Sequence, residues 1–233
     1  MAGNKPEVKA ITDIARNKLQ LKISGDVDTK SLEKLYTDIR FCVCDIKPGF
    51  DVIVDTSQCN LLYVTSLPVY KKIIDYLISK KVGQVVRIAK NNSIIRKQFI
   101  NFTNKIQCYK ASYAQDAEEA EKKLEIFKRR NGARFQLFGL KIEYRIKDES
   151  GKGLLVDIST GGCAIESPTL PLSIDTEILL SFTFSEHDTL TSNFSINAKV
   201  VRIHDGTFGV QFLDLDNDKK EQLYQRITYE VGR

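Results

Sequence analysis

The sequence predicts an α/β domain followed by an all-β domain, in which six antiparallel strands form a barrel that is followed by a C-terminal helix. Three observations support this prediction. Strand-like and helix-like spacings of apolar residues alternate in the first half, the spacing changes to a period of two after Arg129, and the balance of charge reverses between the halves. We expect residues 1–125 to form the α/β domain and residues 126–233 the barrel.

The first domain is predicted to contain a sheet covered by helices, because helices separate its strands. Strands are expected at residues 19–24, 50–54, 84–89 and 108–111. Helices are expected at residues 31–43, 67–80 and 93–106, and a charged helix at 114–128 completes the domain. Asp28 or Thr29 is placed to cap the first helix, and Pro48 with Gly49 ends it.

The second domain is predicted from six segments with a period of two and no helix between them. These segments are residues 135–146, 153–158, 162–166, 177–184, 194–203 and 207–212. Turn-forming residues separate them, at 148–153, 160–162, 168–171, 187–192 and 205–206. Such a series favours a small closed barrel, and residues 213–233 are expected to start with acidic residues and continue as a helix.

The charge asymmetry supports the division into two domains. Residues 1–113 hold 19 Lys/Arg and 10 Asp/Glu, whereas residues 114–233 hold 16 and 20. A basic and an acidic half suggest domains with different partners, and ordinary surface solvation is an equal alternative.

The composition is that of a globular protein, with 42% apolar and 28% charged residues. No apolar run is long enough to cross a bilayer, and the N-terminus has no signal-peptide core, so we expect a cytoplasmic protein without membrane insertion. The cysteines are odd in number and scattered, which favours reduced thiols over disulfides: Cys42, Cys44, Cys59, Cys108 and Cys163. Cys42 and Cys44 form CxC with no histidine nearby, so no metal site is expected.

Three short motifs of the second half carry the functional prediction. Arg130 and Arg134 form an RxxxR that follows Arg129. A DxSxxG follows after 22 intervening residues, and the last predicted strand holds the third motif, Gly209 to Phe212. The DxSxxG is made of Asp157, Ser159, Gly161 and Gly162. Each motif alone is weak, and their order, spacing and all-β setting make the combination specific.

The arginine, aspartate, serine and glycine residues of these motifs are suited to binding a compact anionic ligand that carries planar bases. An arginine can grip phosphate or the Hoogsteen edge of guanine at two points, and it can stack on a base. Asp157 offers two acceptors for the N1–H and N2–H₂ of guanine, and Ser159 can bond to phosphate or ribose. Gly161 and Gly162 permit close approach. Arg130 and Arg134 are expected on a surface loop, so their loss should leave the fold intact.

The motifs resemble the PilZ family, whose members bind cyclic di-GMP, over roughly residues 128–230. The resemblance implies a cyclic di-GMP receptor with ligand contacts from Arg129, Arg130, Arg134, Asp157, Ser159, Gly161 and Gly162. In such domains the residue before RxxxR influences whether one ligand or a stacked pair is held. Arg129 can offset the added charge and stack on an added base, so two ligands per chain are expected.

The first half resembles in pattern a STAS domain, the fold of anti-sigma-factor antagonists, over roughly residues 8–125. The resemblance implies a protein partner and a phosphorylation site after a strand that ends in Asp55, at Thr65 or Ser66. The usual Asp-Ser-Ser-Gly is missing, which favours a plain helix cap instead.

An enzyme is not expected. His187 and His204 have no nucleophile motif nearby, no P-loop pattern exists, and no EAL- or GGDEF-like run is present. The expected function is a receptor without cofactor, in which ordering of residues 129–134 changes the domain arrangement and signals to a protein partner. The alternative is a protein-interaction module with no nucleotide ligand. Nucleic acid is a weak candidate, because no recognised binding motif occurs.

Overall fold

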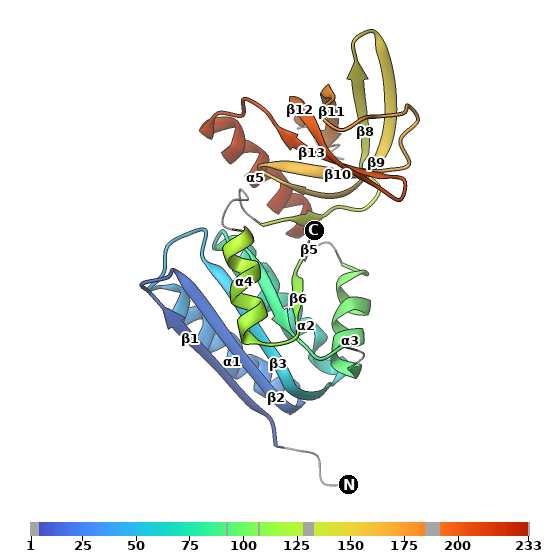
Figure 1. Ribbon diagram of the computed structural model, residues 1–233. Coiled ribbons are helices and arrows are strands. Elements are labelled where there is room, and N and C mark those ends of the chain that lie inside the picture. Colours follow the sequence, from blue (N-terminus) through green and yellow to red (C-terminus); the bar gives the residue numbers. More distant parts are fainter. Residues whose placement is uncertain (1–4, 92, 107, 128–132, 185–191, 233) are drawn as a thin grey trace. The chain divides into compact units, whose positions relative to one another are not determined.

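The computed structural model describes residues 5–91, 93–106, 108–127, 133–184 and 192–232 (Figure 1). The chain divides into two compact units, Met1–Ala133 and Arg134–Arg233. The N-terminal unit is α/β and the C-terminal unit is built on an antiparallel barrel with a C-terminal helix, which confirms the fold class predicted from the sequence.

The N-terminal unit contains a five-stranded sheet with the order β1-β2-β3-β4-β6. β1 runs antiparallel to β2, and the remaining neighbours are parallel. The strands are β1 (Glu7–Asp13), β2 (Lys18–Val27), β3 (Asp51–Leu62), β4 (Val85–Ile88) and β6 (Ser112–Ala114). The sequence did not predict β1, because this edge strand fully buries only Val8 and so lacks a clear alternation of apolar residues.

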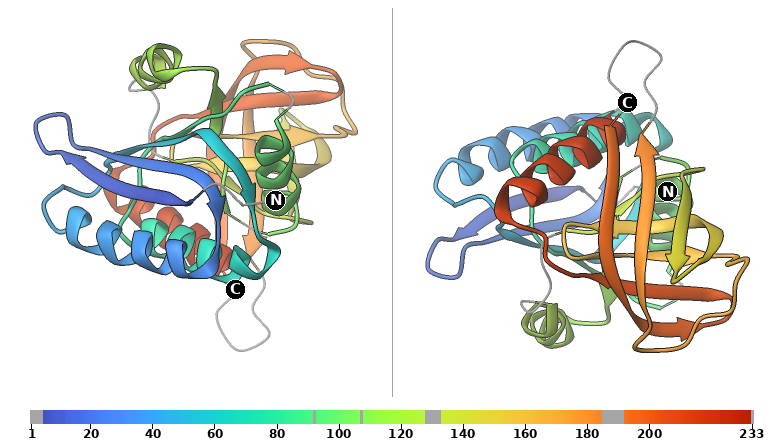
Figure 2. Two further views of the ribbon diagram at one scale, coloured as in Figure 1. Left: turned by 90° about the horizontal axis from the view of Figure 1, so that it is seen from below. Right: turned by 90° about the horizontal axis from the view of Figure 1, so that it is seen from above.

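Helices cover both faces of this sheet. α1 and α2 lie side by side on one face, and α4 lies on the opposite face (Figures 1 and 2). The helical elements are α1 (Thr29–Val43), the 3₁₀ turn η1 (Val64–Ser66), α2 (Leu67–Ser79), α3 (Ile94–Thr103) and α4 (Ala117–Phe127), with the short strand β5 (Cys108–Tyr109) after α3. As predicted, Asp28 caps α1: its carboxylate accepts the backbone N–H of Ser31 at 2.8 Å.

The barrel of the C-terminal unit is closed by six antiparallel strands in the cyclic order β9-β8-β11-β12-β13-β10. Closure occurs because β10 pairs with both β13 and β9. The strands are β8 (Lys141–Ile146), β9 (Glu149–Ser159), β10 (Gly162–Glu166), β11 (Glu177–Phe184), β12 (Ser192–His204) and β13 (Thr207–Phe212). The predicted six-stranded barrel is therefore confirmed.

Two boundaries around β8 were predicted wrongly. Residues 135–146 are not one strand, because the two-residue strand β7 (Phe135–Gln136) is separated from β8. The glycines of residues 148–153 suggested a turn, yet they lie inside β9. A side chain on Gly151 would overlap the Tyr144 ring, and one on Gly153 would overlap Ile165. These glycines therefore serve close packing in a strand.

Two local signals near the C-terminus were predicted correctly. Asp205 and Gly206 have φ values of 45° and 70° and form the tight turn between β12 and β13. Asp216 begins α5 (Asn217–Gly232), because its carboxylate accepts the backbone N–H of Lys219 at 2.7 Å. The turn predicted at 187–192 falls almost wholly outside the described residues.

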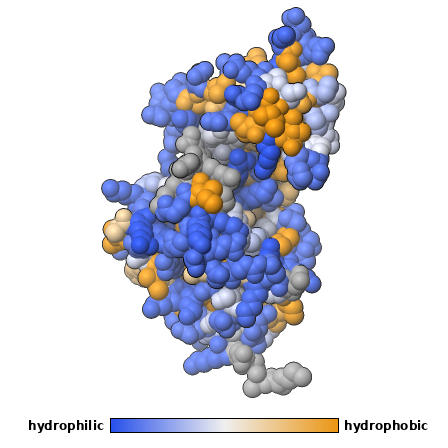
Figure 3. Space-filling model, viewed as in Figure 1, coloured by the Kyte–Doolittle hydropathy of each residue, from blue (hydrophilic) through white to orange (hydrophobic). Residues whose placement is uncertain are grey.

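None of the helices that the structure describes is both long and apolar enough to span a bilayer. Exposed apolar residues do occur on the barrel strands, including Leu154 on β9 and Val201 and Ile203 on β12. Figure 3 shows apolar side chains gathered on the C-terminal unit, whereas the N-terminal unit presents a mainly hydrophilic surface in this view.

Candidate ligand-binding site

The three sequence motifs converge on one region of the C-terminal unit. Arg134 directly precedes β7, and Asp157 lies near the end of β9. β10, which begins at Gly162, pairs with β9 on one side and with β13, the strand of the third motif, on the other. Arg129 and Arg130 lie outside the residues that the structure describes, so their predicted contacts stay predictions.

A bulge in β9 decides which way Asp157 points. Residues 151, 153 and 155 alternate with more exposed residues, as one face of a strand packed on the core does. If the alternation continued, residue 157 would be the next to point into the core, but the next apolar core residue is Ile158. The pairing with β10 shifts at this point: Ala164 pairs with Asp157, whereas Ile165 pairs with Leu155. The extra residue, Val156, reverses the alternation and leaves Asp157 on the face opposite Ile158.

Asp157 forms an ion pair with Arg134 across the 22 residues that separate them in sequence. Nη1 of Arg134 donates a hydrogen bond to Oδ1 of Asp157. The Asp157 side chain is 4% exposed and that of Arg134 is 30% exposed. Arg134 lies outside the strands and is partly exposed, as expected for a loop residue, and it also pairs with a buried carboxylate, which the sequence analysis did not predict.

The remaining polar groups of DxSxxG hold the β9–β10 turn together. The Ser159 hydroxyl donates to the carbonyl oxygen of Gly162 at 3.1 Å and accepts the backbone N–H of Gly161 at 3.3 Å. Ser159 is buried, so in this structure its hydroxyl serves the turn. Its predicted contact with phosphate or ribose stays a prediction.

The two glycines of the motif have distinct roles in packing. The carbonyl oxygen of Gly161 accepts the backbone N–H of Phe212 at 3.0 Å, which joins the second motif to the third. A Cβ on Gly162 would overlap the carbonyl oxygen of Val210. Gly162 therefore admits the backbone of β13.

The pKa of the Cys163 thiol depends on burial and on the charges beside this turn. The thiol is fully buried, and burial raises its pKa well above the usual range. The negative charge of Asp157 raises the pKa further, and the positive charge of Arg134 lowers it. The thiol thus lies within the field of the ion pair and stays protonated at neutral pH.

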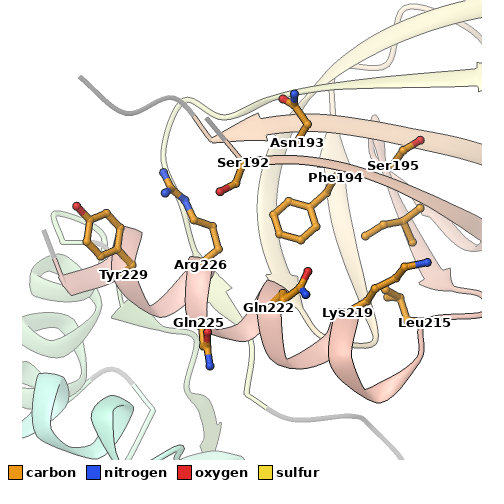
Figure 4. Close-up of a pocket in the computed structure, with 11 residues that line it drawn as sticks. Ser192, Asn193, Phe194, Ser195, Leu215, Lys219, Gln222, Gln225, Arg226 and Tyr229 are labelled. Atoms are coloured by element: carbon orange, nitrogen blue, oxygen red, sulfur yellow. The ribbon is translucent and has the colours of Figure 1, made fainter. Parts of the chain in front are cut away.

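A groove of about 580 Å³ lies elsewhere on the C-terminal unit, between α5 and the start of β12 (Figure 4). Phe194 and Tyr229 contribute aromatic rings, and Lys219 and Arg226 contribute cations. None of the described residues predicted to contact the ligand lines this groove. The sequence analysis did not identify it, because α5 and β12 come together only in the fold.

The two phosphorylation candidates of the N-terminal unit differ in access. Ser66 is fully buried, and its hydroxyl donates to the carbonyl oxygen of Val27 at 3.3 Å. Thr65 is exposed, and its carbonyl oxygen accepts the hydroxyl of Thr29 at 3.2 Å. Only Thr65 is therefore accessible to a modifying enzyme in this conformation.

The cysteines are all free thiols, of which Cys44 is exposed and Cys59, Cys108 and Cys163 are buried. Within the part of the chain that the structure describes, no three side chains of the His, Cys, Asp or Glu type gather as metal ligands would.

The PilZ domain family matches residues 128–230. Similar solved structures include the PilZ domain of CeSA from a cellulose-synthesizing bacterium, with 18% identity, a TM-score of 0.32, and coverage of 40% of this chain and 93% of that one. The PilZ domain of YcgR from Escherichia coli, solved with cyclic di-GMP, has 18% identity, a TM-score of 0.33, and coverage of 40% and 80%. No curated protein gives a significant match.

The N-terminal half has structural relatives of another kind. The anti-sigma factor antagonist SpoIIAA in its unphosphorylated form has 11% identity, a TM-score of 0.37, and coverage of 54% of this chain and 99% of that one.

The C-terminal unit is a small antiparallel barrel in which the second motif lies on β9, β10 and the turn between them, and the third lies on β13, which pairs with β10. Residues 128–230 are a PilZ domain.

Proposed function

We propose that this protein is a cyclic di-GMP receptor that signals through its N-terminal unit to a protein partner. The observation that carries the proposal is the pairing of Arg134 with Asp157 in a domain of the PilZ family. Residues from two motifs that are separated by 22 intervening residues meet at one place, as a shared ligand site requires.

The ligand chemistry fits the arginines that precede β7 in sequence. Cyclic di-GMP carries two phosphate charges and two guanines, and an arginine can contact both kinds of group. The six-residue segment 129–134 contains three arginines, Arg129, Arg130 and Arg134, and the half of the chain in which it lies is otherwise acidic. We propose that these arginines hold the phosphates and the Hoogsteen edges of guanine. The N6 amino group of adenine would face an arginine donor to donor, so cyclic di-AMP should bind more weakly.

The output is proposed to depend on residues 129–134, which connect the two units in sequence. Ligand contacts made by these residues would favour one arrangement of the units over others. Small-angle scattering of the full chain with and without cyclic di-GMP measures this directly. An unchanged scattering curve at saturation would remove the proposed change of arrangement and leave ligand binding standing.

Calorimetric titration of the full chain with cyclic di-GMP, and separately with cyclic di-AMP, tests the receptor function. Saturable binding of cyclic di-GMP, with cyclic di-AMP at least tenfold weaker, is the expected result. Arg130→Ala should abolish binding at micromolar ligand, and Arg145→Ala, which changes an exposed arginine of β8, serves as the matched control. No heat with either dinucleotide would favour an interaction module without nucleotide ligand.

A further inference from the structure

One stretch of the N-terminal unit contains basic side chains and no acidic ones. Residues 76–115 hold eight Lys/Arg and no Asp/Glu, and they include β4, α3, β5 and β6. The basic side chains in α3 and at its two ends are exposed or half-buried: Lys90, Arg96, Lys97 and Lys105. Because the first turn of α3 holds no acidic residue, the positive end of its dipole adds to this charge. The surface around α3 is therefore suited to an anionic partner.

A further cation of this stretch, Arg87 of β4, is buried among rings. Its neighbours in the strand pack against α4, so Arg87 points to the opposite face of the sheet. Arg87 is 1% exposed, and its guanidinium lies 5.1 Å from the ring centroid of Phe99. Beyond burial, the leading electrostatic influences on Arg87 come from the phenols of Tyr70, Tyr109 and Tyr113. Ring faces offset only part of the cost of burying a cation, so an anion close to Arg87 would be bound favourably.

Tyr113 connects this buried cation to the surface. Nη1 of Arg87 donates a hydrogen bond to the Tyr113 hydroxyl oxygen at 3.2 Å. Since a guanidinium is a donor only, the hydroxyl keeps its own proton to donate, and the bond from a cation polarises that O–H. Tyr113 is half-buried, and the guanidinium of Arg96 lies 4.9 Å from its ring centroid. Tyr113 and Arg96 can therefore offer N–H and O–H donors to the same anion.

The acidic side chain that acts on Arg96 is already paired with another cation. Glu119 of α4 lies within the field of Arg96, and it forms an ion pair with Lys123 at 2.7 Å. It also accepts the backbone N–H of Gln115 at 2.7 Å. Arg96 donates from Nη1 to the side-chain oxygen of Asn91, which is a neutral acceptor. The guanidinium of Arg96 thus keeps both its charge and further N–H donors for a partner.

We propose, on the basis of the protein partner proposed above, that Tyr113 and Arg96 bind a carboxylate from an acidic segment of that partner, and that the buried charge of Arg87 strengthens the Tyr113 hydrogen bond. A protein segment fits better than nucleic acid for two reasons. The rings of Tyr70, Phe99 and Tyr109 are buried and cannot stack on bases. Ile94, the first residue of α3, is 66% exposed and offers an apolar contact.

Fluorescence anisotropy of the full chain with a fluorescein-labelled peptide of glutamate and leucine tests this assignment. The same peptide with glutamine in place of glutamate should bind about tenfold more weakly. Arg96→Gln and Tyr113→Phe should each weaken binding of the acidic peptide by about fivefold, as expected for the loss of a hydrogen bond to a charged group. Lys34→Gln removes an exposed charge from α1 and should change it by less than about twofold.

Arg87→Met tests the role of the buried charge. It should weaken the acidic peptide by about fivefold and leave the melting midpoint of the N-terminal unit unchanged or higher, because an apolar side chain replaces a buried cation that has no carboxylate partner. A midpoint lowered by more than about 5 °C would show that the rings and Tyr113 satisfy the cation in the free protein, which would contradict this role.

Other outcomes would overturn the surface as a whole. It fails if the acidic peptide does not bind saturably, if both peptides bind equally, or if Arg96→Gln and Tyr113→Phe have no more effect than Lys34→Gln. Tighter binding of a single-stranded oligonucleotide than of the acidic peptide would assign the surface to nucleic acid instead. The peptides are titrated without dinucleotide, so a chain that binds the acidic peptide and no cyclic di-GMP would overturn the receptor function and leave this surface standing.

Discussion

Replacing Arg134 by alanine should destabilise the C-terminal unit, because it removes the partner of a buried carboxylate. Breaking a fully buried ion pair costs about 3–5 kcal/mol, and an exposed pair is worth about 0–1 kcal/mol. Asp157 is 4% exposed and Arg134 is 30% exposed, so this pair lies between the two limits. We expect a loss of about 2 kcal/mol in the free energy of unfolding.

Differential scanning calorimetry of the full chain without ligand measures this loss. A domain of this size shifts in Tm by about 4–8 °C per kcal/mol, so Arg134→Ala should lower the midpoint of the C-terminal unit by about 10 °C. The double variant Arg134→Ala/Asp157→Asn should recover more than half of the shift, because no charge is then left buried. Arg145→Ala should stay within about 0.5 kcal/mol of wild type.

The reasoning would be refuted if Arg134→Ala and Arg145→Ala shifted the midpoint equally. It would also be refuted if the double variant were less stable than Arg134→Ala, since that result would make the Asp157 carboxylate stabilising without its partner.

Three further predictions concern the same unit. Calorimetry should give two cyclic di-GMP per chain, and Arg129→Leu should reduce this number towards one; saturation of the wild type at one would remove the stacked pair. Gly162→Ala should cost more than about 2 kcal/mol in chemical denaturation, because its Cβ would overlap the Val210 carbonyl oxygen, and a wild-type midpoint would contradict this close approach. Iodoacetamide mass spectrometry at pH 8 should show Cys44 modified first and Cys163 last, since burial raises the pKa of the Cys163 thiol; equal rates would contradict its burial.

The sequence predicted those parts of the fold that depend on local patterns. The period of two, the Asp205–Gly206 turn and the Asp28 cap are each set by neighbouring residues, and the structure has all of them. The edge strand β1 was missed, because only one of its faces meets the core and few of its residues need to be apolar.

The sequence identified residues of the candidate site, but it did not predict how their side chains are arranged. The motifs named Arg134, Asp157 and Ser159, and the fold brings the first two into contact. The ion pair depends on the bulge at Val156, which leaves no signature in an alternating pattern. The burial of Asp157 likewise follows from the tertiary arrangement. Residue type alone therefore does not indicate that Asp157 and Ser159 are buried in the structure.

The bulge at Val156 has a consequence for how this strand tolerates change. The register of β9 with β10 depends on the number of residues in β9 and not on the side chain at the bulge. Substitution of Val156 by another residue of similar size should therefore leave Asp157 where it is. Deletion of Val156 would leave Leu155 opposite Ile165 and Asp157 opposite Ala164, so the two strands could pair without a bulge and Asp157 would stay on the face opposite Leu155 and Ile158. In homologous barrels, loss of the single bulge residue would therefore leave the polar and core positions of the motif on the same faces. The spacing between Leu155 and the acidic residue can thus vary by one without turning the carboxylate, because the bulge absorbs the extra residue.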